Sequence, residues 1–134
     1  MKTYAGSCHC KAVRFEVDLD DHLEKASQCN CTFCTKRGGI GCLLKPKEFR
    51  LVSGEESLAK YEFGMKVGQH RFCKTCGVYC FGTGHLPELG GDFVSINVNC
   101  LDEVDPGQLS LIYWDGRHNN WEAGPRKAPW PIFA

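Results

Sequence analysis

The sequence contains no long hydrophobic segment, and its longest uninterrupted apolar runs, VYCF and LIYW, have four residues each. A helix that spans a membrane needs about 20 predominantly apolar residues, so none is predicted. The N-terminal segment MKTYAGSCHC also lacks the apolar stretch of a secretory signal peptide. We therefore expect a protein of the cytoplasm, where thiols stay reduced.

The chain also lacks a net charge. The chain has 16 Lys and Arg residues against 16 Asp and Glu residues, which gives a formal net charge of zero. Proteins that bind nucleic acid or an anionic membrane usually carry a basic patch or stripe. We therefore expect neither partner, and a nucleic-acid-binding zinc module is disfavoured. The sequence leaves the oligomeric state open.

Long amphipathic helices and internal repeats are absent, and short strand patterns take their place. Residues 12–19 alternate apolar and polar side chains, and residues 92–101 do so again. Further strand candidates lie at residues 40–45, 57–64, 68–73 and 108–114. Together with 15 glycines, these strands predict a single all-β domain over residues 1–134, mainly antiparallel and with long loops. Its core is expected over about residues 5–115.

Two segments have less regular patterns. Residues 25–31 are predicted to return antiparallel to the strand at residues 12–19. Residues 115–134 hold three of the six prolines within their last ten positions, which excludes regular sheet or helix there. Because this segment also carries two tryptophans and Phe133, we expect an irregular tail that folds over the body and buries them.

Ten cysteines are the most unusual feature of the composition, and they stand at positions 8, 10, 29, 31, 34, 42, 73, 76, 80 and 100. A disulfide framework is typical of secreted chains, and no secretion signal is predicted here. Clustered cysteines in a cytosolic protein more often bind metal or take part in chemistry. We therefore interpret the clusters first as metal ligands.

Cys73 and Cys76 form a Cys-x-x-Cys pair followed by glycine, which is the form of a zinc knuckle. Structural zinc takes four ligands, and Cys8 and Cys10 can supply the other two, because residues i and i+2 of an extended strand face the same side. The four cysteines predict a closed tetrahedral site. A redox pair, which belongs at a helix N-terminus in a βαβ unit, and cysteines that bind no metal are the alternatives. His9 is expected to point away from the ion.

A second group, Cys29, Cys31 and Cys34, is compact enough for three sulfurs to bind one ion. Three protein ligands with a vacant fourth position are typical of catalytic zinc, where water or substrate occupies the opening. The alternative is a second closed site, completed by one of the distant cysteines Cys42, Cys80 and Cys100. Positions 42 and 100 lie in apolar strand patterns typical of core residues, so Cys80 is the stronger candidate for a fourth ligand.

The ligand set of the second group indicates a class of reaction. Three thiolates on a divalent ion leave one negative charge, which makes a weak Lewis acid for the activation of water. A soft ligand such as a substrate thiol suits this site better, and zinc lowers the pKa of a thiol strongly. A thiolate held beside an aldehyde adds to the carbonyl group and gives a hemithioacetal.

The segments GSCHCKAVRFEV, CNCTFCTKRG and RFCKTCGVYCFGTG resemble the motif series of the glutathione-dependent formaldehyde-activating family, over roughly residues 5–115. The resemblance implies a β-tent of small antiparallel sheets around zinc, and an enzyme that condenses glutathione with formaldehyde, formally a carbon–sulfur lyase. It implies two zinc ions per chain: a structural one at Cys8, Cys10, Cys73 and Cys76, and a catalytic one at Cys29, Cys31 and Cys34.

The chain departs from the family pattern at Cys80, because CGVYCF stands where the family often has CGTPLF. A related zinc domain occurs in a centromere-associated protein, so the scaffold also serves non-catalytic roles. The leading hypothesis is a zinc enzyme that adds glutathione or a similar thiol to formaldehyde or another small aldehyde. The alternative is a non-catalytic, zinc-stabilised binding module.

Candidate substrate-binding residues lie beside the second cysteine group and near the C-terminus. Lys36 and Arg37 could balance the charge of the thiolates, attract an anionic thiol, or simply be solvated. In YWDGRHNNW, Arg117 could bind a carboxylate and one of the tryptophans could cover the site. We favour instead a tail that packs its aromatic side chains and leaves Arg117 in solvent.

Overall fold

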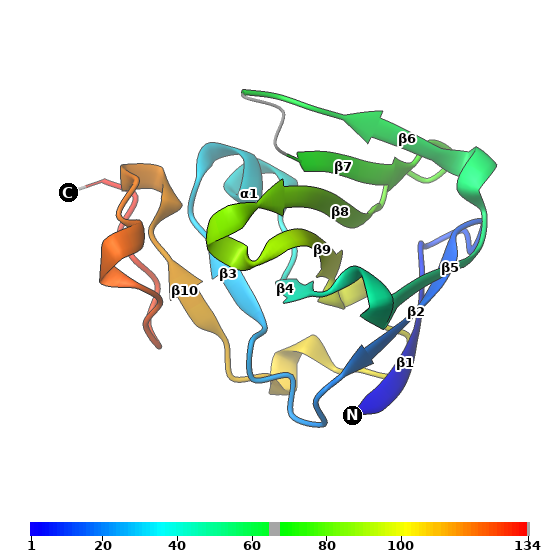
Figure 1. Cartoon of the computed structure of the whole chain (residues 1–134), viewed down its shortest axis with the longest axis horizontal. Coiled ribbons are helices and arrows are strands. Elements are labelled where there is room, and N and C mark those ends of the chain that lie inside the picture. Colours follow the sequence, from blue (N-terminus) through cyan, green and yellow to red (C-terminus); the bar gives the residue numbers. More distant parts are fainter. Residues whose placement is uncertain (65–67, 134) are drawn as a thin grey trace.

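A computed structural model describes residues 1–64 and 68–133 (Figure 1), and within them the chain is built mainly of β-strands. The first half holds β1 (Lys2–Ser7), β2 (Arg14–Leu19), β3 (Ser27–Cys29), α1 (Thr32–Arg37), β4 (Gly41–Leu44) and β5 (Phe49–Ser53). The second half holds β6 (Leu58–Tyr61), β7 (Gly68–Cys73), β8 (Tyr79–Leu86), β9 (Gly91–Asn97) and β10 (Ile112–Trp114). Short 3₁₀ turns connect many of these elements.

The strands form two sheets. The first has the order β1-β2-β5 and is antiparallel throughout. The second has the order β10-β3-β4-β9-β8-β7-β6, in which only the pair β10–β3 is parallel within the described ranges. The expected all-β, mainly antiparallel class is confirmed.

The predicted partner of residues 25–31 is wrong. Strand β3 pairs in parallel with β10 and touches β4 through the single antiparallel pair Ser27–Gly41, and it does not join β2. The edges of β2 are taken by β1 and β5. A strand of three residues carries too little alternation to identify its partner, and here that partner lies more than 80 positions further along the chain.

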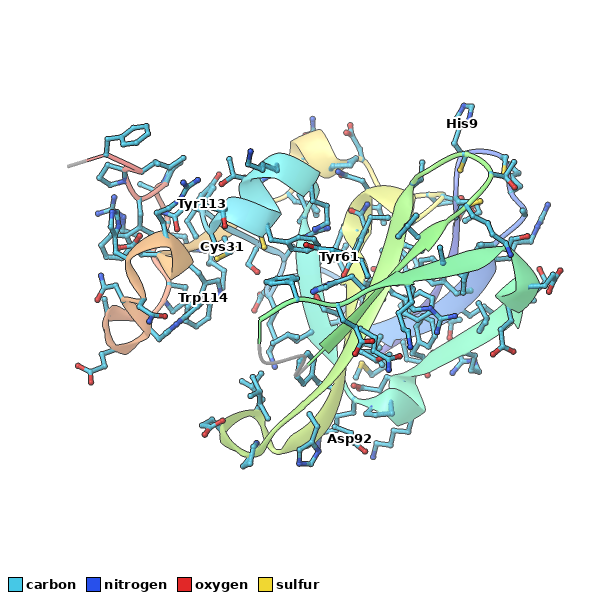
Figure 2. The ribbon with its side chains drawn as sticks, turned by 90° about the horizontal axis from the view of Figure 1, so that it is seen from above. His9, Cys31, Tyr61, Asp92, Tyr113 and Trp114 are labelled. Atoms are coloured by element: carbon cyan, nitrogen blue, oxygen red, sulfur yellow. The ribbon has the colours of Figure 1, made fainter. Side chains whose placement is uncertain are left out.

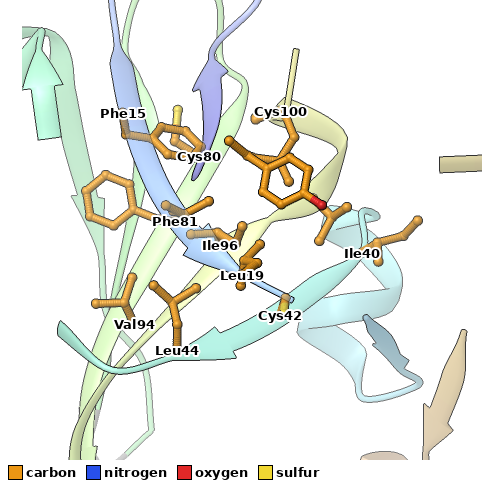
Figure 3. Packing of buried hydrophobic residues seen from close by; sticks show 14 of the residues in the cluster. Phe15, Leu19, Ile40, Cys42, Leu44, Cys80, Phe81, Val94, Ile96 and Cys100 are labelled. Carbon is orange, nitrogen blue, oxygen red and sulfur yellow. The ribbon is translucent and has the colours of Figure 1, made fainter. Parts of the chain in front are cut away.

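The core lies between the two sheets (Figure 3). Phe15 and Val17 of β2 and Ile96 of β9 are at most 1% exposed, as the alternation of polar and apolar residues predicts. The rings of Phe49 and Phe81 lie 4.6 Å apart and join the aromatic packing around Phe15. Burial of these large side chains is the main favourable contribution to folding.

The C-terminal tail packs along β10, beside α1 and away from the N-terminus (Figure 1). It contains two 3₁₀ turns, Gly116–His118 and Trp121–Ala123, and is otherwise irregular up to residue 133. Two backbone hydrogen bonds between Tyr113 and Arg126, of 2.8 and 3.1 Å, fix it to β10. The expectation that the tail buries its large apolar side chains is wrong for Trp121 and Phe133, which are 51% and 88% exposed.

None of the helices in the described residues combines the length and the apolar character needed to cross a membrane.

Candidate metal centres and the adjoining cavity

The structure brings Cys8, Cys10, Cys73 and Cys76 together, with all four Sγ atoms within 4.8 Å of one another. The Sγ of Cys10 lies 3.7 Å from that of Cys8 and 3.7 Å from that of Cys73. Four sulfurs bound tetrahedrally at about 2.3 Å from a zinc ion are separated by roughly 3.8 Å. The donor set and its spacing therefore fit a closed four-sulfur metal site.

The backbone at Cys8 and Cys10 differs from the prediction. Strand β1 ends at Ser7, and the two cysteines lie in a tight turn closed by a 3.1 Å hydrogen bond from Lys11 N–H to the carbonyl of Cys8. Lys11 has a φ of 67°, in the left-handed region. The sulfurs thus converge through a turn and not through the period of an extended strand. His9 is exposed and points outward at the edge of the molecule (Figure 2), as expected.

The knuckle at Cys73 and Cys76 has the predicted form. Gly77 has a φ of 79°, and its N–H donates to the carbonyl of Cys73 at 2.7 Å, which closes the turn. Desolvation raises the pKa of Cys76, but hydrogen bonds with the backbone of Cys10 and Val78 outweigh it and lower the pKa to about 6. This environment favours a thiolate, the form that binds metal.

The second group, Cys29, Cys31 and Cys34, also has its Sγ atoms within 4.8 Å of one another. Cys29 ends β3, Cys31 caps the N-terminus of α1, and Cys34 lies in that helix. The backbone N–H of Cys34 donates to the Sγ of Cys31 at 3.3 Å. The sequence prediction did not include α1, although the basic Lys36 and Arg37 followed by glycine are a helix-end signal.

Hydrogen bonding among the three thiols of this group shifts their pKa values in opposite directions. Hydrogen bonds from the thiols of Cys29 and then Cys34 hold the pKa of Cys31 far below its ordinary value. The thiol of Cys29 is the largest cause of a raised pKa at Cys34. The group thus concentrates electron-rich sulfur in a half-buried position, which suits a soft divalent cation.

Arg37 supplies positive charge next to these sulfurs, which is one of the roles considered for it. One of its Nη atoms lies 4.0 Å from the Sγ of Cys34, and its guanidinium stacks 4.1 Å from the ring centre of Tyr79. Its Nε and other Nη atoms are buried and have no hydrogen-bond partner in the described part of the chain. Lys36, by contrast, is exposed.

Cys80 does not join the second group. It is fully buried, its thiol donates to the carbonyl of Val78 at 3.5 Å, and the neighbouring thiol of Cys100 is the largest cause of its raised pKa. Cys42 is also a buried core residue, at 2% exposure, as predicted. Within residues 1–64 and 68–133, the second group therefore has three cysteine ligands and no fourth Cys, His, Asp or Glu in reach.

A polar network that sequence reasoning missed fixes the loop of the second group. The buried carboxylate of Asp115 accepts hydrogen bonds from the amide of Asn30 at 2.9 Å and from Asn120 at 3.3 Å, and it is paired with His118 at 2.8 Å. Asn30 separates Cys29 from Cys31, so the network positions both ligands. No spacing rule connects Asn30 to a residue 85 positions away.

Arg117 was considered either as a residue that binds a substrate carboxylate or as a solvated side chain, and the structure shows it in contact with the loop of the second group. Its Nε donates to the carbonyl of Asn30 at 2.8 Å, and its Nη2 donates to the hydroxyl of Thr35 at 3.3 Å. The side chain is half-buried and holds the ligand loop against α1. The expectation that Arg117 is left in solvent is therefore wrong, because two of its nitrogens bond to Asn30 and Thr35.

A cavity of about 280 Å³ adjoins the second group. One side is formed by Cys29, Cys34 and the neighbouring polar residues Gln28, Asn30 and Thr35, with Gly38 and Gly39. The other side is formed by β10 and the tail, through Tyr113, Trp114, Pro129, Trp130 and Ile132. Figure 2 shows Cys31, Tyr113 and Trp114 gathered in this region, where the tail meets α1.

Comparison with known proteins agrees with the motifs. Residues 3–114 match the family model described as "Glutathione-dependent formaldehyde-activating enzyme". Two curated proteins carry the name "Putative glutathione-dependent formaldehyde-activating enzyme". The one from Halomonas elongata is 32% identical over 100 residues, and the one from Penicillium rubens is 29% identical over 99 residues.

The extent of these matches differs between the relatives. The alignments cover 67% and 69% of this chain but only 62% and 51% of the Halomonas and Penicillium proteins, so the chain spans less than two thirds of either. A crystal structure of a Rhodobacter sphaeroides protein is similar with a TM-score of 0.72 and 35% sequence identity. That match covers 82% of this chain and 98% of the Rhodobacter chain.

Proposed function

Since the chain belongs to the glutathione-dependent formaldehyde-activating enzyme family, we propose that it is a zinc-dependent enzyme that adds glutathione, or a similar thiol, to formaldehyde or another small aldehyde. In the reverse direction the reaction is that of a carbon–sulfur lyase. Ten cysteines outside any disulfide suit a reducing compartment, so we place the enzyme in the cytoplasm.

The two cysteine groups have different roles in this proposal. Cys8, Cys10, Cys73 and Cys76 hold a structural zinc ion, because four sulfurs leave no position for a substrate. Cys29, Cys31 and Cys34 hold the catalytic zinc ion. The observation that carries the proposal is that this second group has three ligands and adjoins a cavity, within the described residues.

The reaction joins the thiol sulfur to the carbonyl carbon. The S–H bond and the carbonyl π bond break, the C–S bond forms, and the thiol proton ends on the carbonyl oxygen. When bound, zinc supplies positive charge that favours the thiolate form of the incoming thiol. The three cysteines define where that thiol lies, Arg37 offsets their negative charge, and the adjoining cavity orients the partner molecule.

The test is the rate at which formaldehyde and glutathione exchange with their adduct, measured by NMR exchange spectroscopy with the zinc-loaded protein. We expect the protein to accelerate exchange and the Cys31→Ser variant to lose the acceleration. Cys42→Ala, which removes a buried cysteine outside both groups, is the matched control and should keep it. If the wild-type protein does not change the exchange rate, both groups only hold the fold and the enzymatic proposal is wrong.

A further inference from the structure

Three residues of the tail, Pro129, Trp130 and Ile132, form one wall of the cavity. This tail wall lies outside the residues that match the family model, which end at residue 114. Its central residue is Trp130, whose Nε1–H donates to the carbonyl of Tyr113 at 2.9 Å. The guanidinium of Arg126 stacks 3.9 Å from the centre of the Trp130 ring. The wall is therefore fixed to β10 before any ligand binds, which limits the entropy cost of binding.

In the part of the chain that the structure describes, the residues that line the cavity carry no formal charge apart from its two cysteines. Its other side chains are polar amides and hydroxyls on one side and Trp114, Trp130 and Ile132 on the other. Arg126 of the tail donates its Nε and Nη2 hydrogens to the carbonyls of Ala128 and Pro129, at 3.0 and 2.6 Å. Arg37 beside Cys34 and Arg117 on Thr35 place positive charge at the cysteine side of the cavity. The tail side, formed in the described residues by Trp114, Trp130 and Ile132, suits an uncharged apolar group.

The size of the cavity exceeds what formaldehyde requires. A volume of about 280 Å³ corresponds to about nine water molecules at roughly 30 Å³ each. Formaldehyde has two heavy atoms and would leave most of this space unfilled. Glutathione is large enough, but its two carboxylates do not suit the apolar tail side, so its peptide part belongs away from that side.

We propose that the cavity receives the uncharged aromatic or branched substituent of an aldehyde larger than formaldehyde, and that Trp130 determines this specificity. This inference rests on the proposed function, because it takes the addition of a thiol to an aldehyde as the reaction. The thiol sulfur bonds to the carbonyl carbon, the thiol proton passes to the carbonyl oxygen, and the substituent of that carbon lies between Trp114 and Trp130. An aromatic substituent gains both apolar burial and ring contacts there.

The first arm of the test measures binding without chemistry. Benzyl alcohol, a neutral and unreactive probe, should perturb the tryptophan signals of the protein in NMR spectra, whereas benzoate should not. Trp130→Ala should weaken benzyl alcohol binding roughly tenfold, the lower range for one apolar contact. Phe133→Ala is the matched control, because Phe133 lies three residues further along the tail, is 88% exposed and does not line the cavity.

A second variant keeps the binding test decisive if Trp130→Ala fails to fold. Ile132→Lys places a cation in the cavity and should allow benzoate to bind while benzyl alcohol binding falls. Binding of benzyl alcohol that is unchanged by both variants would overturn the proposal.

The second arm separates this inference from the proposed function. With glutathione, the wild-type protein should accelerate adduct formation with benzaldehyde more than with formaldehyde, and Trp130→Ala should reverse the order. Probe binding without any thiol addition would keep the cavity assignment and refute the enzymatic function. Thiol addition with a formaldehyde preference that Trp130→Ala leaves intact would keep the function and refute the specificity.

Discussion

Gly116 shows how closely the chain after β10 packs against the second cysteine group. A Cβ built on this residue would collide with the Sγ of Cys29 and would lie 2.9 Å from the Trp121 ring. Real Cβ atoms essentially never approach another atom this closely. The absence of a single methyl group therefore allows Cys29 to lie within reach of the other two sulfurs.

Gly116→Ala should displace the Cys29 thiol and weaken metal binding at the second group, while the first group keeps its metal. Changes just outside the ligands of a metal site commonly cost roughly 10- to 100-fold in affinity, and we expect a loss in this range. Competition with a chromophoric chelator, fitted to two sites, measures it. Gly41→Ala is the control, because a Cβ there makes only ordinary contacts, the nearest at 3.5 Å. Equal affinities in Gly116→Ala and wild type would contradict this packing account.

At the scale of elements, the carboxylate of Asp18 links all three strands of the first sheet. Asp18 of β2 accepts hydrogen bonds from both Nη atoms of Arg50 in β5, each at 3.0 Å, and from the Thr3 hydroxyl of β1 at 2.8 Å. The hydrogen bonds from Arg50, and then that from Thr3, lower the pKa of Asp18 from 3.8 to about 2. Because the folded-state pKa is lowered, this contribution to stability is present above the ordinary pKa and is lost as the pH falls towards 2.

Asp18→Asn should therefore be less stable than wild type at neutral pH, by an amount that shrinks between pH 4 and pH 2. Urea unfolding of both proteins at each pH measures this difference. Protonation of the cysteine groups affects both proteins alike and cancels in the comparison. Glu103→Gln, which changes an exposed carboxylate, should show no such trend. A constant difference across this pH range would show that the Arg50 and Thr3 contacts do not stabilise the charged form.

The elements could be predicted where the pattern is local and long enough. Strand β2 follows from strict alternation, and the Pro46–Glu48 turn follows from the preference of proline for a first helical turn. Strand β9 ends at Asn97, although alternation continues to Cys100, because a 3₁₀ turn buries Val98 and Cys100. The pairing of β3 with β10 was beyond prediction, since contacts between distant short strands leave no trace in either one.

At the scale of the whole molecule, the first cysteine group joins the end of β1 in the first sheet to β7 in the second. Cys10 and Cys73, whose sulfurs are in contact, are 63 residues apart in the chain. The second group lies within one short segment, between β3 and α1 at the side of the second sheet. Metal at the first group therefore constrains the entire fold, whereas metal at the second constrains one loop.

Cys73→Ser should unfold the protein or lower its melting temperature severely, while Cys31→Ser should keep the fold and lose thiol binding. Circular dichroism and thermal melts of the zinc-loaded proteins measure the first effect, and glutathione titration measures the second. Cys42→Ala serves as the control for loss of a buried cysteine. If Cys73→Ser and Cys31→Ser unfold the chain equally, the division into a structural and a catalytic site is wrong.

The two cysteine groups could be predicted in full from spacing, since the seven residues come together as two sets. The side chains that surround and position these groups could not be predicted from the sequence. Asp115, Arg117 and Trp130 reach the second group only through the parallel pairing of β10 with β3 and the docking of the tail. Such contacts depend on tertiary structure, and the side chains involved are ordinary residues of a polar, proline-rich segment.

The central claim is that the second cysteine group is open to a thiol, and the absorption spectrum of the cobalt-substituted protein tests it most directly. Cobalt reports the number and kind of its ligands, where zinc has no visible spectrum. We predict two sulfur-rich tetrahedral sites, with glutathione shifting the bands of one site in the wild-type protein and having no such effect in Cys31→Ser. Two sites whose bands are both unchanged by saturating glutathione would contradict the account.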